Sequence, residues 1–157
     1  MKLFIFSFLL VLNAAANFES FSFPSDRSLY IIDGDSVSLQ MRLAGIDTPE
    51  IKQKCRKRAD KMVDCGQLSK HYLKKLLKKL PGEITITPIA IDGYQRILVR
   101  VYKGDVNVGK RMVEVGMAFS YKDTYKLEEQ TAKAEKLGFW SFDTPPIRPY
   151  KWRKQHR

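Results

Sequence analysis

The sequence predicts a mainly β fold, in which short strands close into a small barrel that is packed with a few helices. The chain has 157 residues, the length of one ordinary domain, and 44% of them are hydrophobic, which is enough to bury a core. Short strand-like runs are concentrated in the first half, the second half is more helical, and no linker separates them. This composition excludes a disordered basic tail or a collagen-like chain.

The net charge of +11 and the pI near 9.7 indicate a polyanionic partner, a nucleic acid or an anionic membrane surface. Two Cys and two His are too few for a zinc finger or a His-rich metal centre.

The first 16 residues are typical of a targeting segment. Lys2 precedes an apolar run over residues 3–12, and residues 13–16 are small, as a signal peptidase requires. The run is about half the roughly 20 residues that span a bilayer. We therefore expect removal of residues 1–16, a single domain over 17–157 with a basic tail from about 143, and a periplasmic or secreted location without stable membrane association.

Strand signals begin at residues 29–32, which end at the turn Asp33-Gly34-Asp35. Apolar and polar residues then alternate over 37–43, so that Arg42 projects from the face opposite the apolar set. A straight strand would hold Arg42 about 20–25 Å from Asp35. A tight hairpin within this short segment is therefore expected to bring Arg42 back. Residues 83–87 and 97–102 are further strands, joined through a turn at 92–93.

Three runs have the periodicity of amphipathic helices, at residues 66–80, 108–115 and 127–137. In the first, apolar residues recur every four positions, and Pro81-Gly82 ends the helix. In the third, Leu127, Ala134 and Leu137 are expected to face inward.

Cys55 and Cys65 are ten residues apart in a basic stretch, residues 51–66, that is expected to be an irregular loop. In an oxidising compartment they can form a disulfide, which would restrict the unfolded chain by roughly 2–3 kcal/mol. Two unpaired thiols are the alternative.

Three short segments at the ends of the predicted strands together contain candidate catalytic residues: residues 32–36, 42–50 and 92–96. Asp35 and Asp47 are short carboxylates beside turns, which is ligand material for Ca²⁺. Glu50 can accept a proton from water or orient it. Arg42 and Arg96 can each donate two hydrogen bonds to phosphate oxygens. A metal, a carboxylate and paired arginines suffice for phosphodiester hydrolysis.

The order of these segments resembles the thermonuclease, or staphylococcal-nuclease-like, family. The resemblance covers residues 28–152 and is carried by Asp33-Gly34-Asp35, by the segment from Arg42 to Glu50 (RLAGIDTPE), by Tyr94-Gln95-Arg96, and by the later motifs GMA at 116–118 and LGFWS at 137–141. Gln95 stands where Gly commonly precedes the second arginine of the family.

The resemblance implies a five-stranded OB-fold barrel with three α-helices. It also implies a Ca²⁺-dependent, sugar-nonspecific nuclease that cuts DNA and RNA to leave 3′-phosphate ends. By motif position, the metal would be held by Asp35, Asp47 and the Thr48 carbonyl, and Asp33 would support that site. Arg42, Glu50 and Arg96 would be catalytic. Tyr94, with Tyr121, would bind substrate.

Six basic residues follow Glu50 closely and are expected to guide a nucleic-acid strand: Lys52, Lys54, Arg56, Lys57, Arg58 and Lys61. The basic tail over 148–157 is either a frayed end or part of this surface. We expect a secreted monomeric nuclease. The alternatives are a catalytically inactive OB-fold nucleic-acid-binding protein and a restriction-type Asp…Glu-x-Lys nuclease, in whose central strand Pro49 would fit poorly.

Overall fold

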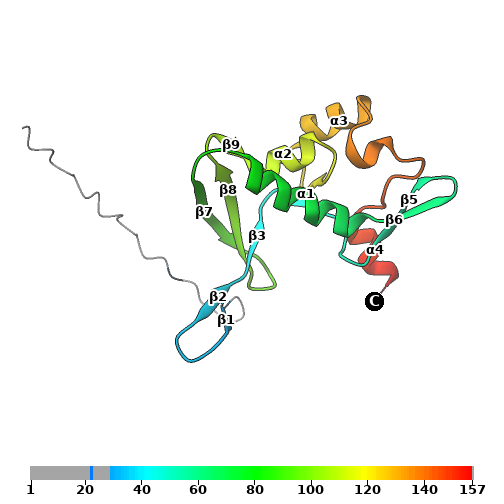
Figure 1. Cartoon of the computed structure of the whole chain (residues 1–157). Helices are drawn as coiled ribbons and strands as arrows, with labels where there is room; N and C mark the ends of the chain where they lie inside the picture. The colour runs from blue at the N-terminus through cyan, green and yellow to red at the C-terminus, as the bar shows by residue number, and fades with distance from the viewer. Residues whose placement is uncertain (1–21, 23–28, 157) are drawn as a thin grey trace, which may run out of the picture.

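The protein is described by a computed structural model that covers residue 22 and residues 29–156. The predicted leader, residues 1–16, lies outside the described residues. The described part of the chain forms ten strands and four α-helices. Figure 1 shows how the labelled elements are arranged. The strands are β1 (Leu29–Ile31), β2 (Val37–Leu39), β3 (Met41–Leu43), β4 (Ile46–Asp47), β5 (Lys54–Arg58), β6 (Lys61–Asp64), β7 (Ile84–Ile91), β8 (Ile97–Lys103), β9 (Val106–Asn107) and β10 (Phe119–Ser120). The helices are α1 (Cys65–Lys79), α2 (Val108–Glu114), α3 (Lys126–Ala134) and α4 (Pro149–Gln155), with a 3₁₀ helix at Gly138–Ser141.

The central sheet has the strand order β3-β8-β7, with β9 folded back on β8. β3 runs parallel to β8, and β7 runs antiparallel to it. Ile97 and Val99 of β8 are almost fully buried, because their face of the sheet packs toward the helices. Arg42 lies opposite Leu98 in the register and therefore points to the other face. The strand predicted at 97–102 is confirmed, and the one predicted at 83–87 is the first part of a longer strand.

The three predicted helices are confirmed as α1, α2 and α3. A core of six buried residues lies where α1 and α2 meet β4: Ile46, Leu76, Val108, Met112, Val113 and Ala118. The inward face predicted for α3 is wrong. Leu127 is 73% exposed, whereas Ala132 and Glu129 are buried. A fourth helix, α4, forms within the predicted basic tail, which is therefore not a frayed end.

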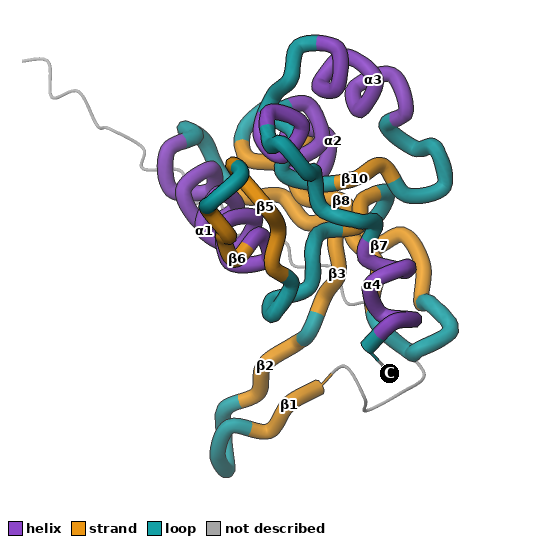
Figure 2. The backbone as a smooth tube through the Cα atoms, turned by 90° about the vertical axis from the view of Figure 1, so that its right-hand side faces the viewer, coloured by secondary structure: helices purple, strands orange, loops and turns teal. Residues whose placement is uncertain are grey.

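The described strands form four separate sheets and no closed barrel, so the predicted five-stranded OB barrel is not observed. β1 and β2 form a hairpin that projects from the rest of the protein in both views (Figures 1 and 2). The tight hairpin expected between Asp35 and Arg42 is also absent. Only Gln40 separates β2 from β3, and an antiparallel return needs at least about two loop residues.

The expected loop over 51–66 is a second hairpin, β5–β6, followed directly by α1. The predicted disulfide is present. Cys55 and Cys65 are joined with a Cα–Cα distance of 6.0 Å and are both buried. The bond ties β5 to the first residue of α1 and so closes the segment that follows Glu50. None of the helices in the described residues has the length and apolar content needed to cross a membrane.

Candidate active site

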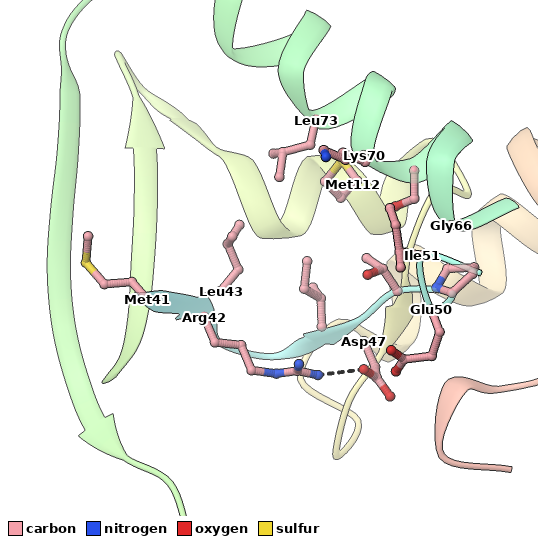
Figure 3. A pocket seen from close by; sticks show the side chains of 14 residues that line it. Met41, Arg42, Leu43, Asp47, Glu50, Ile51, Gly66, Lys70, Leu73 and Met112 are labelled. Atoms are coloured by element: carbon pink, nitrogen blue, oxygen red, sulfur yellow. Dashed lines mark hydrogen bonds and ion pairs between the residues drawn. The ribbon is translucent and has the colours of Figure 1, made fainter. Parts of the chain in front are cut away.

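Arg42 of β3, Asp47 of β4 and Glu50, which follows β4, lie close together. Nη2 of Arg42 donates to Oδ1 of Asp47 at 2.6 Å, and the Glu50 carboxylate lies beside this pair (Figure 3). Gly45, at φ +77°, makes the turn between β3 and β4 that returns Asp47 to Arg42. Asp47 is 5% exposed, so its carboxylate makes its polar contacts with protein groups such as Arg42 and hardly with water.

The backbone around Glu50 is held by groups whose role the sequence did not indicate. The side chain of Gln53 is almost fully buried. Its Oε1 accepts from the backbone amide of Glu50 at 3.1 Å, and its Nε2 donates to the backbone carbonyl of Ile147 at 2.9 Å. The backbone amide of Gln53 in turn donates to the backbone carbonyl of Glu50 at 2.7 Å. Gly66 of α1 packs so closely that a Cβ there would lie 1.9 Å from the Glu50 carbonyl oxygen. The start of α1 therefore determines where Glu50 lies.

The turn between β7 and β8 presents Arg96. Asp92 organises this turn, because its Oδ1 accepts from the amides of Tyr94 and Arg96 at 2.9 and 3.0 Å. Its Oδ2 accepts from Nε and Nη2 of Arg96 at 2.8 and 2.6 Å. Burial acts to raise the pKa of Asp92, but the hydrogen bonds from Arg96 and Tyr94 outweigh it and hold the pKa below its ordinary value. Gln95 has φ +63°, the left-handed conformation in which Gly would be unstrained.

A third arginine enters the site from α4. Arg153 donates to Oε1 of Glu50 and, through Nη2, to Oδ2 of Asp47 at 3.2 Å. Partial burial acts to lower the pKa of Arg153, and the hydrogen bonds and charges of Glu50 and Asp47 raise it above its ordinary value. From the sequence this residue belongs only to a basic tail, because no local pattern connects it with Glu50, more than 100 positions earlier.

The tail reaches the site because it is anchored just before α4. Arg148 donates to Oε1 of the buried Glu129 at 2.6 Å and to the carbonyl of Ser120 at 3.2 Å. Glu129 also accepts from the Ser120 amide at 2.8 Å and pairs with Lys133. Its buried charge is thus fully partnered, and α4 is fixed against the end of β10.

A hollow of about 270 Å³ opens beside these groups and brings together all three residues expected to be catalytic, Arg42, Glu50 and Arg96. Its lining residues are Arg42, Glu50, Tyr94, Arg96 and Arg153. Tyr94 is 68% exposed and stacks its ring at 5.1 Å from the Arg96 guanidinium. Thr48 lines the adjoining hollow toward α1, and Tyr121 lines another with Asp47.

Asp35 and Asp33 are not brought to this site. Both lie at the exposed tip of the β1–β2 hairpin, outside the hollows that Asp47 lines. The Asp33 carboxylate accepts from the Asp35 amide at 3.2 Å, and hydrogen bonds from Ser36 and Asp35 hold the pKa of Asp33 below its ordinary value. No group of three acidic, His or Cys side chains that could hold a metal occurs among the described residues. A single chain therefore brings Asp47, Thr48 and Glu50 close together, but it does not form the calcium site predicted from Asp35, Asp47 and Thr48.

The arrangement suits an anionic diester. Three guanidinium groups surround a hollow that also exposes a carboxylate, so phosphate oxygens and a nucleophilic water can be held side by side. The aromatic ring of Tyr94 at the rim offers a stacking surface for a base. A small basic domain with this site belongs to the class of phosphodiester-binding hydrolases.

Comparison with known proteins narrows this class. The pattern of the family described as "Staphylococcal nuclease homologue" matches residues 40–142. A Haemophilus influenzae protein named "Uncharacterized endonuclease" is 33% identical over 144 residues, which cover 83% of this chain and 74% of that protein. The chain belongs to the staphylococcal nuclease family. The predicted enzyme class, a nuclease, is confirmed at the level of the family.

Fungal proteins named "Probable endonuclease LCL3" are more distant. The one from Candida dubliniensis is 28% identical over 135 residues and the one from Candida albicans 29%. The matches cover 76% of this chain but 54% of either fungal protein, so this chain spans about half of their length.

Proposed function

We propose that this protein hydrolyses phosphodiester bonds in DNA and RNA without selecting the sugar. The observation that carries the proposal is the single hollow in which Arg42, Arg96 and Glu50 meet. The hollow presents guanidinium groups suited to phosphate and an aromatic ring suited to a base. Both polymers carry these groups, so we expect both to bind. The products expected are 3′-phosphate ends, as in the family that the sequence resembles.

In the proposed mechanism, Arg42 and Arg96 bind the non-bridging oxygens and stabilise the charge that develops on the five-coordinate phosphorus. Arg153 holds Oε1 of Glu50, and the second oxygen of that carboxylate accepts the proton of the attacking water. The water oxygen bonds to phosphorus as the P–O5′ bond breaks, and the departing 5′-oxygen takes up a proton from solvent, which leaves a 3′-phosphate and a 5′-hydroxyl end. We also propose Ca²⁺ as the cofactor, held by Asp47 and the Thr48 carbonyl, where it would add positive charge beside the phosphate. Asp35, the remaining predicted ligand, does not reach this place within one chain.

Basic side chains beyond the hollow support a path for a single strand. Lys52, Lys54 and Arg56 line a cleft of about 900 Å³ together with Trp152. Such a surface binds a flexible strand by charge and stacking, with strong salt dependence. We therefore propose single-stranded or fraying nucleic acid as the preferred substrate.

We further propose that the protein acts outside the cytoplasm, after removal of residues 1–16. The apolar leader and the disulfide between Cys55 and Cys65 support this location, because disulfides persist in oxidising compartments.

A catalytically inactive nucleic-acid-binding protein is the second candidate. It is favoured by one observation, the distance of Asp35 from the other predicted ligands. The restriction-type site is disfavoured, because Lys52 lines the neighbouring cleft and not the hollow of Glu50.

The experiment is to measure cleavage of fluorescently labelled single-stranded DNA and RNA with Ca²⁺, with Mg²⁺ and with a chelator. We expect cleavage of both polymers with Ca²⁺, and Glu50→Gln to lower kcat by about 100-fold or more with little change in substrate binding. The matched control is Glu135→Gln, at an exposed position after α3, which should leave kcat unchanged. An inactive wild type that still binds would establish the second candidate, and a fully active Glu50→Gln would remove the role given to that residue.

A further inference from the structure

The β1–β2 hairpin has one entirely apolar face. Leu29 pairs with Leu39, and Ile31 pairs with Val37, so these four side chains share one side of the hairpin. The other side carries Tyr30, whose hydroxyl donates to Gln40 at 2.8 Å. Ile31 is 70% exposed and Val37 60%. A lone two-stranded hairpin is marginal in water, and one with an open aliphatic face favours packing against another surface.

The central sheet offers a matching surface. Within the described residues β3 and β7 are its two edges, and each is hydrogen-bonded on one side only. On the sheet face that bears the buried Val99, the edge residues Met41, Ile86 and Ile91 are 37%, 43% and 37% exposed. Every residue of β7 is exposed, although the strand is rich in isoleucine. An uncovered apolar edge of this kind readily accepts a further strand.

The hairpin cannot cover this surface in its own chain while β2 and β3 stay as they are. Gln40 is the only residue between them, and an antiparallel return takes about two residues or more. The two strands instead continue in one direction and carry the hairpin away from the sheet (Figures 1 and 2). Connections too short to fold back are the known cause of exchange of an element between identical chains.

We propose that two copies of this chain exchange their β1–β2 hairpins, each hairpin packing between the open edges of β3 and β7 in the other copy. The barrel that the described strands of one chain do not close is then formed twice, by two chains. The charge of the hairpin also supports a second copy of this chain as its partner. The hairpin has two acidic residues, Asp33 and Asp35, and no basic one, in a chain of net charge +11. Its acidic tip would meet a site surrounded by arginines.

The exchange also completes the active site, a consequence that rests on the proposed function. Asp35 of one chain would lie beside Asp47 of the other and add the carboxylate that a single chain lacks there. Each of the two sites is then made from both chains. In this proposal the protein is a dimer, whereas the sequence analysis expects a monomer.

The first test is the mass of the purified protein in solution by light scattering, which should be twice that of one chain. Inserting about five Gly/Ser residues after Gln40 lets β2 return on its own β3 and should yield a monomer. The control is the same insertion between Ala59 and Asp60, in the exposed turn of the β5–β6 hairpin, which should remain a dimer. A monomeric wild type, or a dimer that survives the insertion after Gln40, would overturn the proposal, whatever its nuclease activity.

The second test is to refold Asp35→Asn and Glu50→Gln chains together. Each variant alone should be inactive. In a mixed dimer, one site would combine the intact Asp35 of one chain with the intact Glu50 of the other. Random pairing makes half the dimers mixed, so about one quarter of wild-type activity should return. No return of activity from a mixture whose parent wild type is active would reject the exchange and leave the nuclease proposal standing. An inactive wild type would reject the nuclease proposal, and the mass measurements would still decide the exchange.

Discussion

Gly66→Ala tests whether α1 positions the catalytic carboxylate. The new Cβ would lie 1.9 Å from the carbonyl oxygen of Glu50 and 2.5 Å from its carbonyl carbon. Real Cβ contacts are essentially never under 3.0 Å, so α1 or the Glu50 backbone must move by about 1 Å. A displacement of this size at a reacting group costs about 100-fold in rate.

The same substitution should lower the free energy of unfolding by about 1–3 kcal/mol, the usual cost of overpacking, partly offset by the better helix propensity of alanine. Gly109→Ala is the matched control, since Gly109 is likewise the second residue of a buried helix start. Its added Cβ would have ordinary contacts of 3.5–3.7 Å. We would measure kcat on labelled single-stranded DNA, and stability by urea unfolding, for both variants. If Gly66→Ala keeps the rate and stability of Gly109→Ala, the reasoning about α1 is wrong.

Three further predictions concern the arginines of the hollow. Gln95→Gly should raise the free energy of unfolding by about 0.5–1 kcal/mol in urea titrations, because it relieves the left-handed backbone before Arg96; no gain would contradict this. Asp92→Asn should cost about 1–2 kcal/mol near neutral pH. Because the folded pKa of Asp92 is lowered, this difference should be full above its ordinary value of 3.8 and shrink as the pH falls below it; a pH-independent difference would refute it. Arg153→Ala should lower both stability, by about 1–2 kcal/mol, and kcat; unchanged kinetics would show that Arg153 does not hold Glu50.

The helices and the disulfide were predictable because their signals are local. The apolar repeat of α1 and the stop at Pro81-Gly82 depend only on nearby residues, and Cys55 and Cys65 are close in sequence. The barrel was not predictable in the same way. Barrel closure depends on the length of the connection between β2 and β3, which in this chain is the single residue Gln40. The resemblance to a family implies the connection that is usual in that family and not the one in this chain.

The candidate site likewise combines residues that local sequence signals predict with one residue, Arg153, that they do not. Arg42, Asp47 and Glu50 lie within nine residues, and one turn at Gly45 is enough to bring Asp47 onto Arg42. Arg153 contacts the same two carboxylates across sequence separations of 103 and 106 residues. The position of Arg153 depends on the contact of Arg148 with the buried Glu129. No pattern in the tail sequence indicates that contact. The role of a basic tail without acidic residues is therefore ambiguous from its sequence. Its charged side chains can be solvated, or they can neutralise partly buried carboxylates of an active site, as Arg153 does for Glu50 and Asp47.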